Sequence, residues 1–300
     1  MSREPVATRL PLSTGLSVEL LEWSPDDPAC DHTVLLLHGY LDLAWGWKPV
    51  VEAGLSGRYH VVAPSFRGHG ASDWVGAGAM YYFLDYVADV ASVVTQRARK
   101  RLSLVGHSMG GMVSAYFTGT YPELVGKLVL LEGLVVEERP TSPDRLRTSN
   151  GMRADAVERR GTQEEPASRR FASLEEAAAR MRHHDAELSP SLARLLCEKG
   201  CRQLSTGEWV FRHDPLLGPS TPMGFELEVA KRFWSKVQCD VLYVEGDRST
   251  FKLPPEDHAR RLGAFPHMQT KTMPGGSHMM IRHQPDAVSA LLVEFLEMQS

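Results

Sequence analysis

The stretch that decides the fold is LSLVGHSMGG, residues 102–111. Its apolar start, LSLV, has the character of a buried strand, and the following GMVSAYFTGTYPE is typical of a helix. Gly106 and Gly110 flank Ser108, and their lack of side chains permits the tight strand-to-helix turn that strains the serine backbone. The pattern predicts a nucleophile elbow, which presents the Ser108 hydroxyl at the carboxyl edge of a sheet.

Further short apolar runs predict that LSLV is one strand of a mostly parallel sheet. These runs span residues 33–37, 60–63, 127–131 and 241–244. Helix-like segments alternate with the strands in the first half of the chain, which is the pattern of an α/β protein with helices on both faces of the sheet. Residues 7–12 and 16–23 predict an antiparallel hairpin at the sheet edge. In such sheets the ligand lies beyond the carboxyl ends of the strands.

The strand pattern stops between about residues 135 and 236, where the composition becomes charged and helical. We therefore expect a core formed by residues 1–134 and 237–300, with a mainly helical cap inserted at 135–236. A capping box at Ser173 begins one cap helix, and Ser189 followed by proline begins another, which stops at Gly200. A third helix, at about residues 225–236, is expected to return to the sheet.

A serine hydroxyl is a poor nucleophile at neutral pH, so a neighbouring base must take its proton. The chain has twelve histidines, and position therefore says more than residue type. His278 follows Gly275-Gly276, which come after the last expected apolar strand, in the final strand–loop–helix unit and after the nucleophile in chain order. We predict that His278 is the base, whereas His283 fits a surface loop histidine better.

The stretch His38-Gly39-Tyr40 ends the apolar run at 33–37. Negative charge on the carbonyl oxygen of a transition state needs preorganised donors, and one of them belongs at this strand end. We predict that the backbone N–H groups of Tyr40 and Met109 form an oxyanion hole. The alternative is an ordinary strand-to-loop turn.

The chain resembles the α/β-hydrolases in HGY, in PSFRGHGASD (64–73), in GHSMGG (106–111) and in the later GGSH and QPDAV. The resemblance implies the α/β-hydrolase fold with an inserted cap. More narrowly, LLLHGYLD, VGHSMGG, KLVLLEG and HHDAELSPSLARLLCEKG resemble the serine hydrolase-like proteins, a branch with poorly defined substrates. This narrower resemblance identifies no substrate.

The acid that would orient the histidine departs from the commonest pattern of that family. Many members place an aspartate three residues beyond the glycine that follows the late strand, and here that position is Ser249, with Asp247 two residues earlier. In some branches the acid ends the strand after the nucleophile helix, where this chain has Glu132. A carboxylate ending a buried strand needs a partner, which a cationic histidine supplies. We favour Glu132. The alternatives are Asp247, with Glu132 purely structural, and neither residue or a rearranged loop.

These residues predict a serine hydrolase that cleaves a carboxylic ester or thioester through an acyl-enzyme on Ser108, with His278 as the base and Glu132 as the acid that orients His278. The same residue types also serve cofactor-free haloperoxidases, perhydrolases and lyases, and a catalytically weak binding protein is a further alternative. The expected partner is a small-molecule ester or thioester. No metal or other cofactor is expected.

The composition argues against other partners. The formal net charge is -4, and the basic residues are scattered, so neither nucleic acid nor an anionic membrane is implied. No secretion signal or long apolar run is present, and the four cysteines match no zinc spacing, which favours a cytoplasmic protein with reduced thiols. His183-His184-Asp185 is interpreted as a solvated helix end, because adjacent helix positions diverge by about 100°.

Overall fold

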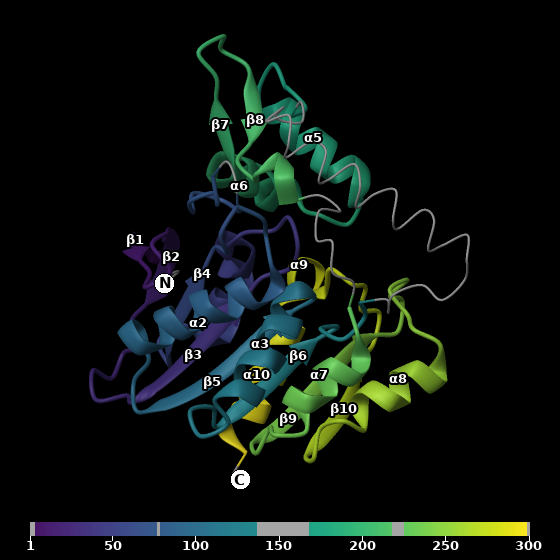
Figure 1. Cartoon of the computed structure of the whole chain (residues 1–300). Coiled ribbons are helices and arrows are strands. Elements are labelled where there is room, and N and C mark those ends of the chain that lie inside the picture. Colours follow the sequence, from purple (N-terminus) through teal and green to yellow (C-terminus); the bar gives the residue numbers. More distant parts are fainter. Residues whose placement is uncertain (1–3, 77–78, 137–167, 218–224, 299–300) are drawn as a thin grey trace.

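The structure, a computed structural model, describes residues 4–76, 79–136, 168–217 and 225–298. An eight-stranded sheet forms the centre of this part of the chain, in the order β1-β2-β4-β3-β5-β6-β9-β10 (Figure 1). Its strands are β1 (Val6–Pro11), β2 (Ser17–Trp23), β3 (His32–Leu37), β4 (His60–Pro64), β5 (Arg101–His107), β6 (Lys127–Leu131), β9 (Asp240–Gly246) and β10 (Met268–Met273).

The prediction of a mostly parallel sheet is confirmed. β1 and β2 form the expected antiparallel edge hairpin, and β2 also runs antiparallel to β4. All other neighbours, from β4 through β3, β5, β6 and β9 to β10, pair in parallel. The carboxyl ends of these strands therefore meet at one edge of the sheet, and residues that follow them in sequence are brought together there.

Helices cover both faces of the sheet (Figure 1). One face packs against α2 (Phe83–Arg97), α3 (Met109–Thr120) and α7 (Leu227–Trp234), with α8 (Pro255–Leu262) beside α7. The other packs against α1 (Lys48–Val50), the short turns η1 (Ala44–Trp47) and η2 (Val51–Leu55), α9 (Met280–His283) and α10 (Pro285–Glu297).

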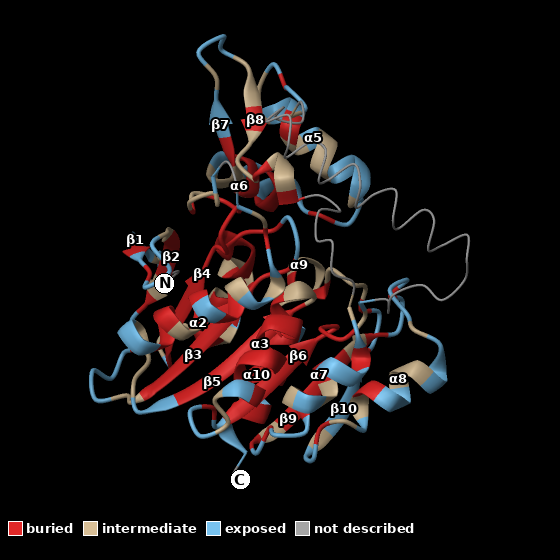
Figure 2. Ribbon diagram, in the orientation of Figure 1, coloured by how far each residue is buried: buried red, intermediate tan, exposed pale blue. Residues whose placement is uncertain are grey.

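The central strands are largely buried (Figure 2) and mostly apolar, because both of their faces are covered. In β3, Leu35 and Leu37 belong to the core on the α2 and α3 side, whereas Val34 and Leu36 belong to the core on the α10 side. All four are at most 1% exposed. Burying each such side chain contributes about 1.5–3 kcal/mol, so these strands form a rigid base for the residues at their ends.

A smaller lobe, the cap, lies beyond the carboxyl ends of the strands (Figure 1). It contains α5 (Leu174–His184), α6 (Pro190–Gly200) and a hairpin of β7 (Cys201–Gln203) and β8 (Trp209–Phe211), followed by η3 (Pro215–Leu217). Both predicted helix starts are confirmed, because the hydroxyls of Ser173 and Ser189 accept N–H bonds from Glu176 and Leu192. The hairpin was not predicted, since strands of three residues are too short for a repeating pattern.

The predicted third helix is α7, which packs on α3 beside the sheet. Residues 137–167 and 218–224, parts of the predicted cap insertion at 135–236, lie outside the described residues. The division into core and cap at those boundaries thus stays a prediction. Among the helices that the structure describes, none has the length and apolar character needed to cross a membrane.

Candidate active site

Ser108 lies in the predicted sharp turn between β5 and α3. Its backbone has φ 51° and ψ -118°, a conformation that residues other than glycine rarely adopt. A Cβ atom added to Gly106 would lie 2.4 Å from the Gly110 carbonyl oxygen, and one added to Gly110 would lie 2.2 Å from that of Leu37. Both glycines are thus required by the close approach of backbone to backbone, and together they hold Ser108 at the strand ends.

Glu132 directly follows β6, the strand next to β5, and also has a positive φ, of 49°. Its side chain is 1% exposed. Oε1 accepts the Gly246 N–H at 2.8 Å, and Oε2 accepts the Ser249 hydroxyl at 2.7 Å and lies 2.6 Å from His278 Nδ1. Burial alone raises a carboxyl pKa, but these hydrogen bonds, led by that of His278, lower the pKa of Glu132 below its usual value.

His278 lies in the loop between β10 and α9, and three contacts fix its position. Nδ1 faces Glu132, the main-chain carbonyl accepts the His107 Nε2–H at 2.7 Å, and the ring of Phe251 stacks on the imidazole with centroids 4.2 Å apart. The carboxylate partner places the proton on Nδ1. Nε2, on the other side of the ring, is then the nitrogen able to accept a proton.

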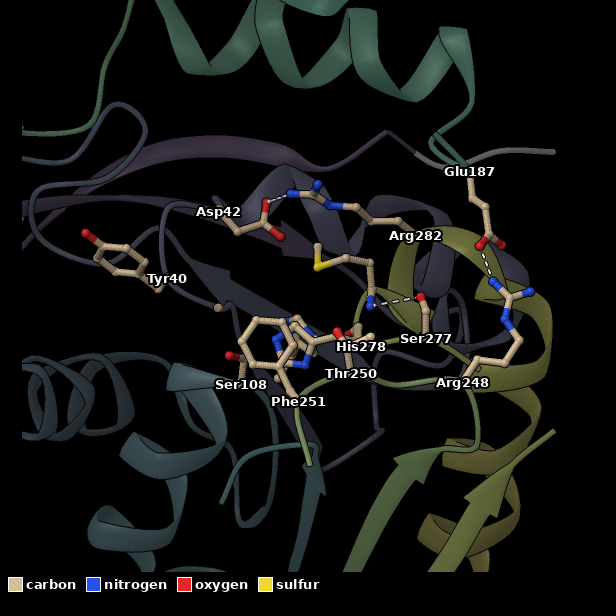
Figure 3. A pocket seen from close by; sticks show the side chains of 13 residues that line it. Tyr40, Asp42, Ser108, Glu187, Arg248, Thr250, Phe251, Ser277, His278 and Arg282 are labelled. Carbon is tan, nitrogen blue, oxygen red and sulfur yellow. Dashed lines mark hydrogen bonds and ion pairs between the residues drawn. The ribbon is translucent and has the colours of Figure 1, made fainter. Parts of the chain in front are cut away.

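Ser108 and His278 line the same cavity, of about 550 Å³, beneath the cap (Figure 3). The other lining residues come from four loops, from the end of β5 and from α9: Gly39, Tyr40, Asp42, His107, Glu187, Arg248, Thr250, Phe251, Ser277, Met279 and Arg282. Figure 3 shows Ser108, Phe251 and His278 together on one wall, with the Asp42–Arg282 ion pair on another. The sheet therefore brings together the nucleophile and base predicted from sequence.

The loop after β3 passes close to Ser108, as the oxyanion-hole prediction requires. A Cβ atom added to Gly39 would lie 3.3 Å from Ser108 Cβ and 3.0 Å from His107 Nδ1. Met109 is the first residue of α3, where a helix leaves N–H groups without intrahelical partners. The roles of the Tyr40 and Met109 N–H groups as oxyanion donors stay a prediction.

Comparison with known proteins agrees with this geometry. A sequence profile described as "Alpha/beta hydrolase family" matches residues 34–291. The chain belongs to the α/β-hydrolase family. A serine hydrolase-like protein of Danio rerio is 31% identical over 280 residues, which cover 91% of this α/β-hydrolase and 84% of the relative. The resemblance to that branch is thus confirmed.

Solved structures share the whole fold of this α/β-hydrolase. The thioesterase domain from the curacin biosynthetic pathway aligns with a TM-score of 0.83 at 21% identity, covering 97% of this chain and 100% of that domain. A hypothetical protein of Pseudomonas aeruginosa PAO1 aligns with a TM-score of 0.80 at 27% identity, covering 99% and 100% of the two chains. The predicted α/β-hydrolase fold is confirmed.

The two candidate acids of this α/β-hydrolase lie in different surroundings. Asp247 is exposed, and within the described residues its side chain neither lines the cavity nor contacts His278. Glu132 is buried against His278, and Ser249 occupies the later acid position and bonds to Glu132. The sequence favoured Glu132 as the acid. It showed Ser249 at the usual acid position but did not predict that this serine contacts Glu132.

One cluster of polar residues between cap and core was not predicted. Asp185 of the cap lies 2.6 Å from His283 Nε2 and 3.8 Å from Arg282, which also pairs with Asp42 at 2.9 Å. His283 Nδ1 is hydrogen-bonded to Ser277, the neighbour of His278, at 2.8 Å. The expectation that His283 lies in a surface loop is wrong, because it ends α9 with its side chain 9% exposed. Its contact with Asp185 joins it to the cap, which is distant in sequence.

Proposed function

We propose that this α/β-hydrolase is a serine hydrolase that cleaves a carboxylic ester or thioester through an acyl-enzyme on Ser108. One observation carries the proposal: His278, in the same cavity as the strained Ser108, has its Nδ1 2.6 Å from the buried Glu132 carboxylate. A carboxylate in that position fixes the imidazole tautomer and stabilises the imidazolium that forms during turnover.

In the proposed first step, His278 Nε2 accepts the Ser108 hydroxyl proton while Oγ attacks the substrate carbonyl carbon. The negative charge that develops on the carbonyl oxygen is held by the backbone N–H groups of Tyr40 and Met109. The imidazolium then donates its proton to the leaving alcohol or thiol. Water, activated by His278 in the same way, attacks the acyl-enzyme and releases the acid and free Ser108.

The protonation state of Glu132 suits this role. Its pKa is lowered by the hydrogen bonds that outweigh its burial, so the carboxylate is anionic at neutral pH. An anion beside Nδ1 stabilises the imidazolium that the mechanism forms in each half-reaction. We further propose that the insertion at 135–236 is the cap that covers the strand ends and selects small-molecule substrates.

The proposal is tested by replacing Ser108 with alanine. We expect hydrolysis of p-nitrophenyl acetate to fall by about three orders of magnitude or more and reaction with a fluorophosphonate probe to disappear, because both need an activated serine. Ser205→Ala, at an exposed serine between β7 and β8, is the matched control and should keep both activities. Full ester turnover by Ser108→Ala would contradict the proposal, and a wild-type protein that does not label would favour a binding protein.

A further inference from the structure

Ser249 shares one oxygen of Glu132 with the proposed catalytic base. The serine lies three residues beyond Gly246, which ends β9, and is 6% exposed. Its hydroxyl donates to Glu132 Oε2 at 2.7 Å, and the same oxygen lies 2.6 Å from His278 Nδ1. Ser249 stands at the position where many family members have an aspartate. It contacts Glu132, the acid proposed for this chain.

Two partners, at the end of β9 and in the loop after it, hold both oxygens of the Glu132 carboxylate. Oε1 accepts the Gly246 N–H at 2.8 Å, whereas Oε2 accepts the Ser249 hydroxyl. The last torsion of a glutamate side chain is broad, so a carboxylate held through only one oxygen can rotate. With both oxygens held, the plane of the Glu132 carboxylate is fixed and Oε2 stays directed at His278.

The direction of the Ser249 proton is itself determined. The Phe251 N–H donates to Ser249 Oγ at 3.2 Å, so the hydroxyl acts as acceptor on that side and as donor toward Glu132. Phe251 in turn stacks on the His278 ring. The loop after β9 thus contacts His278 on its face through Phe251, and at its Nδ1 edge through the carboxylate that Ser249 orients.

We infer that Ser249 is a positioning residue, whose hydroxyl orients the Glu132 carboxylate for His278. This inference rests on the proposed function, because it needs an active Ser108. Ser249 touches neither substrate nor reacting atoms in this role. In this role its effect passes through the Glu132 carboxylate, and this separates it from a serine that only supports the loop.

The test is a double-mutant cycle on wild type, Ser249→Ala, Glu132→Gln and the double variant, with kcat and KM for p-nitrophenyl acetate as readouts. We expect Ser249→Ala to lower kcat about tenfold, the factor that corresponds to losing one hydrogen bond to a charged group, with KM little changed. In the Glu132→Gln background the same change should lower kcat by less than about twofold, because the carboxylate that it orients is absent.

Two results would overturn the inference. One is a Ser249→Ala variant with wild-type kcat, and the other is an equal fold-loss in both backgrounds, which is expected if the serine only supports the loop. If Ser249→Ala lowers the thermal midpoint, Ser249→Cys replaces it in the cycle, because a thiol of similar size is a weak donor. Absence of Ser108-dependent probe labelling in the wild type would instead contradict the proposed function.

Discussion

Ser108 and Glu132 have positive φ angles, of 51° and 49°, although neither is a glycine. Leu41, next to Tyr40 in the loop after β3, is the third such residue in the described part of the chain, with φ 57°. Each strained backbone costs on the order of 1 kcal/mol or more and persists only where the surroundings enforce it. All three follow neighbouring strands of the sheet, so the strain is concentrated where the proposed nucleophile, the proposed acid and the loop of the proposed oxyanion hole meet.

A comparison of two carboxylates at the residue scale tests the assignment of the acid. We expect Glu132→Gln to lower kcat for ester hydrolysis on the order of a thousandfold or more, because an amide at this position no longer stabilises the imidazolium or fixes its tautomer. Asp247→Asn should keep wild-type kcat, since that side chain is exposed. Steady-state kinetics on both variants, with circular dichroism to verify folding, would decide. Retained turnover in Glu132→Gln would refute the assignment.

At the scale of elements, β6 and β9 are adjacent parallel strands, and Glu132 and Ser249 follow their carboxyl ends. The Ser249 hydroxyl is 2.7 Å from the Glu132 oxygen that faces His278. We therefore predict that Ser249→Asp in the Glu132→Gln background restores at least about tenfold of the lost kcat, because a carboxylate from the neighbouring strand reaches the same imidazole edge. The recovery is measured by comparing kcat of the double variant with that of Glu132→Gln across a range of pH.

The matched control carries Ser249→Asn in the same Glu132→Gln background. Asparagine has the size of aspartate but no charge, so this variant should stay as slow as Glu132→Gln alone. Equal rates for the aspartate and asparagine variants would show that the neighbouring strand end does not supply a working acid.

The sequence predicted elements where a local pattern existed. The buried runs of β3, β5, β6 and β9 are apolar on both faces, and the starts of α5 and α6 contain serine caps. It missed the β7–β8 hairpin, and it misjudged β10, which was expected to be apolar. β10 reads MQTKTM and is an edge strand with four exposed residues in its middle, so nothing apolar is required of it.

The candidate site, like the elements, was predictable only where a local sequence pattern existed. The elbow at Ser108 is a local pattern, whereas the choice between Glu132 and Asp247 depends on a loop shape that sequence spacing does not determine. The contact of Asp185 with His283 joins residues 98 apart in the chain. Pairings of that kind follow from the docking of the cap, and no periodicity indicates them.

At the scale of the whole molecule, buried histidines tie stability to pH. Burial lowers the pKa of His69 to about 3 and that of His107 to about 4, so both stay neutral in the folded protein at mildly acid pH. In the unfolded chain they bind protons below their ordinary pKa of about 6.5. Because the unfolded state then holds more protons, these two histidines lower the free energy of unfolding as the pH falls from about 6.5 toward 4, and they contribute no pH dependence above that window.

Replacing His69 tests this linkage. Its Nδ1–H donates to the Arg67 carbonyl at 3.0 Å, a bond that the amide of His69→Asn can imitate without titrating. We expect the free energy of unfolding, measured with urea, to depend less steeply on pH in His69→Asn than in the wild type. The difference in slope is up to about 1.4 kcal/mol per pH unit between about pH 4 and 6.5. Ser205→Asn, at an exposed serine that does not titrate, should leave the slope unchanged. Identical slopes for wild type and His69→Asn would disprove this prediction.

The shared oxygen of Glu132 also bears on how such sites diverge during evolution. Glu132, at the end of β6, and Ser249, in the loop after β9, meet at the carboxylate oxygen that faces the imidazole of His278. If an aspartate introduced at the Ser249 position can replace Glu132, a lineage that gains the second acid before losing the first passes through no inactive ancestor. Neutral drift then suffices to move the acid between strands, and descendants of one gene can differ in this residue without any change of substrate or selection.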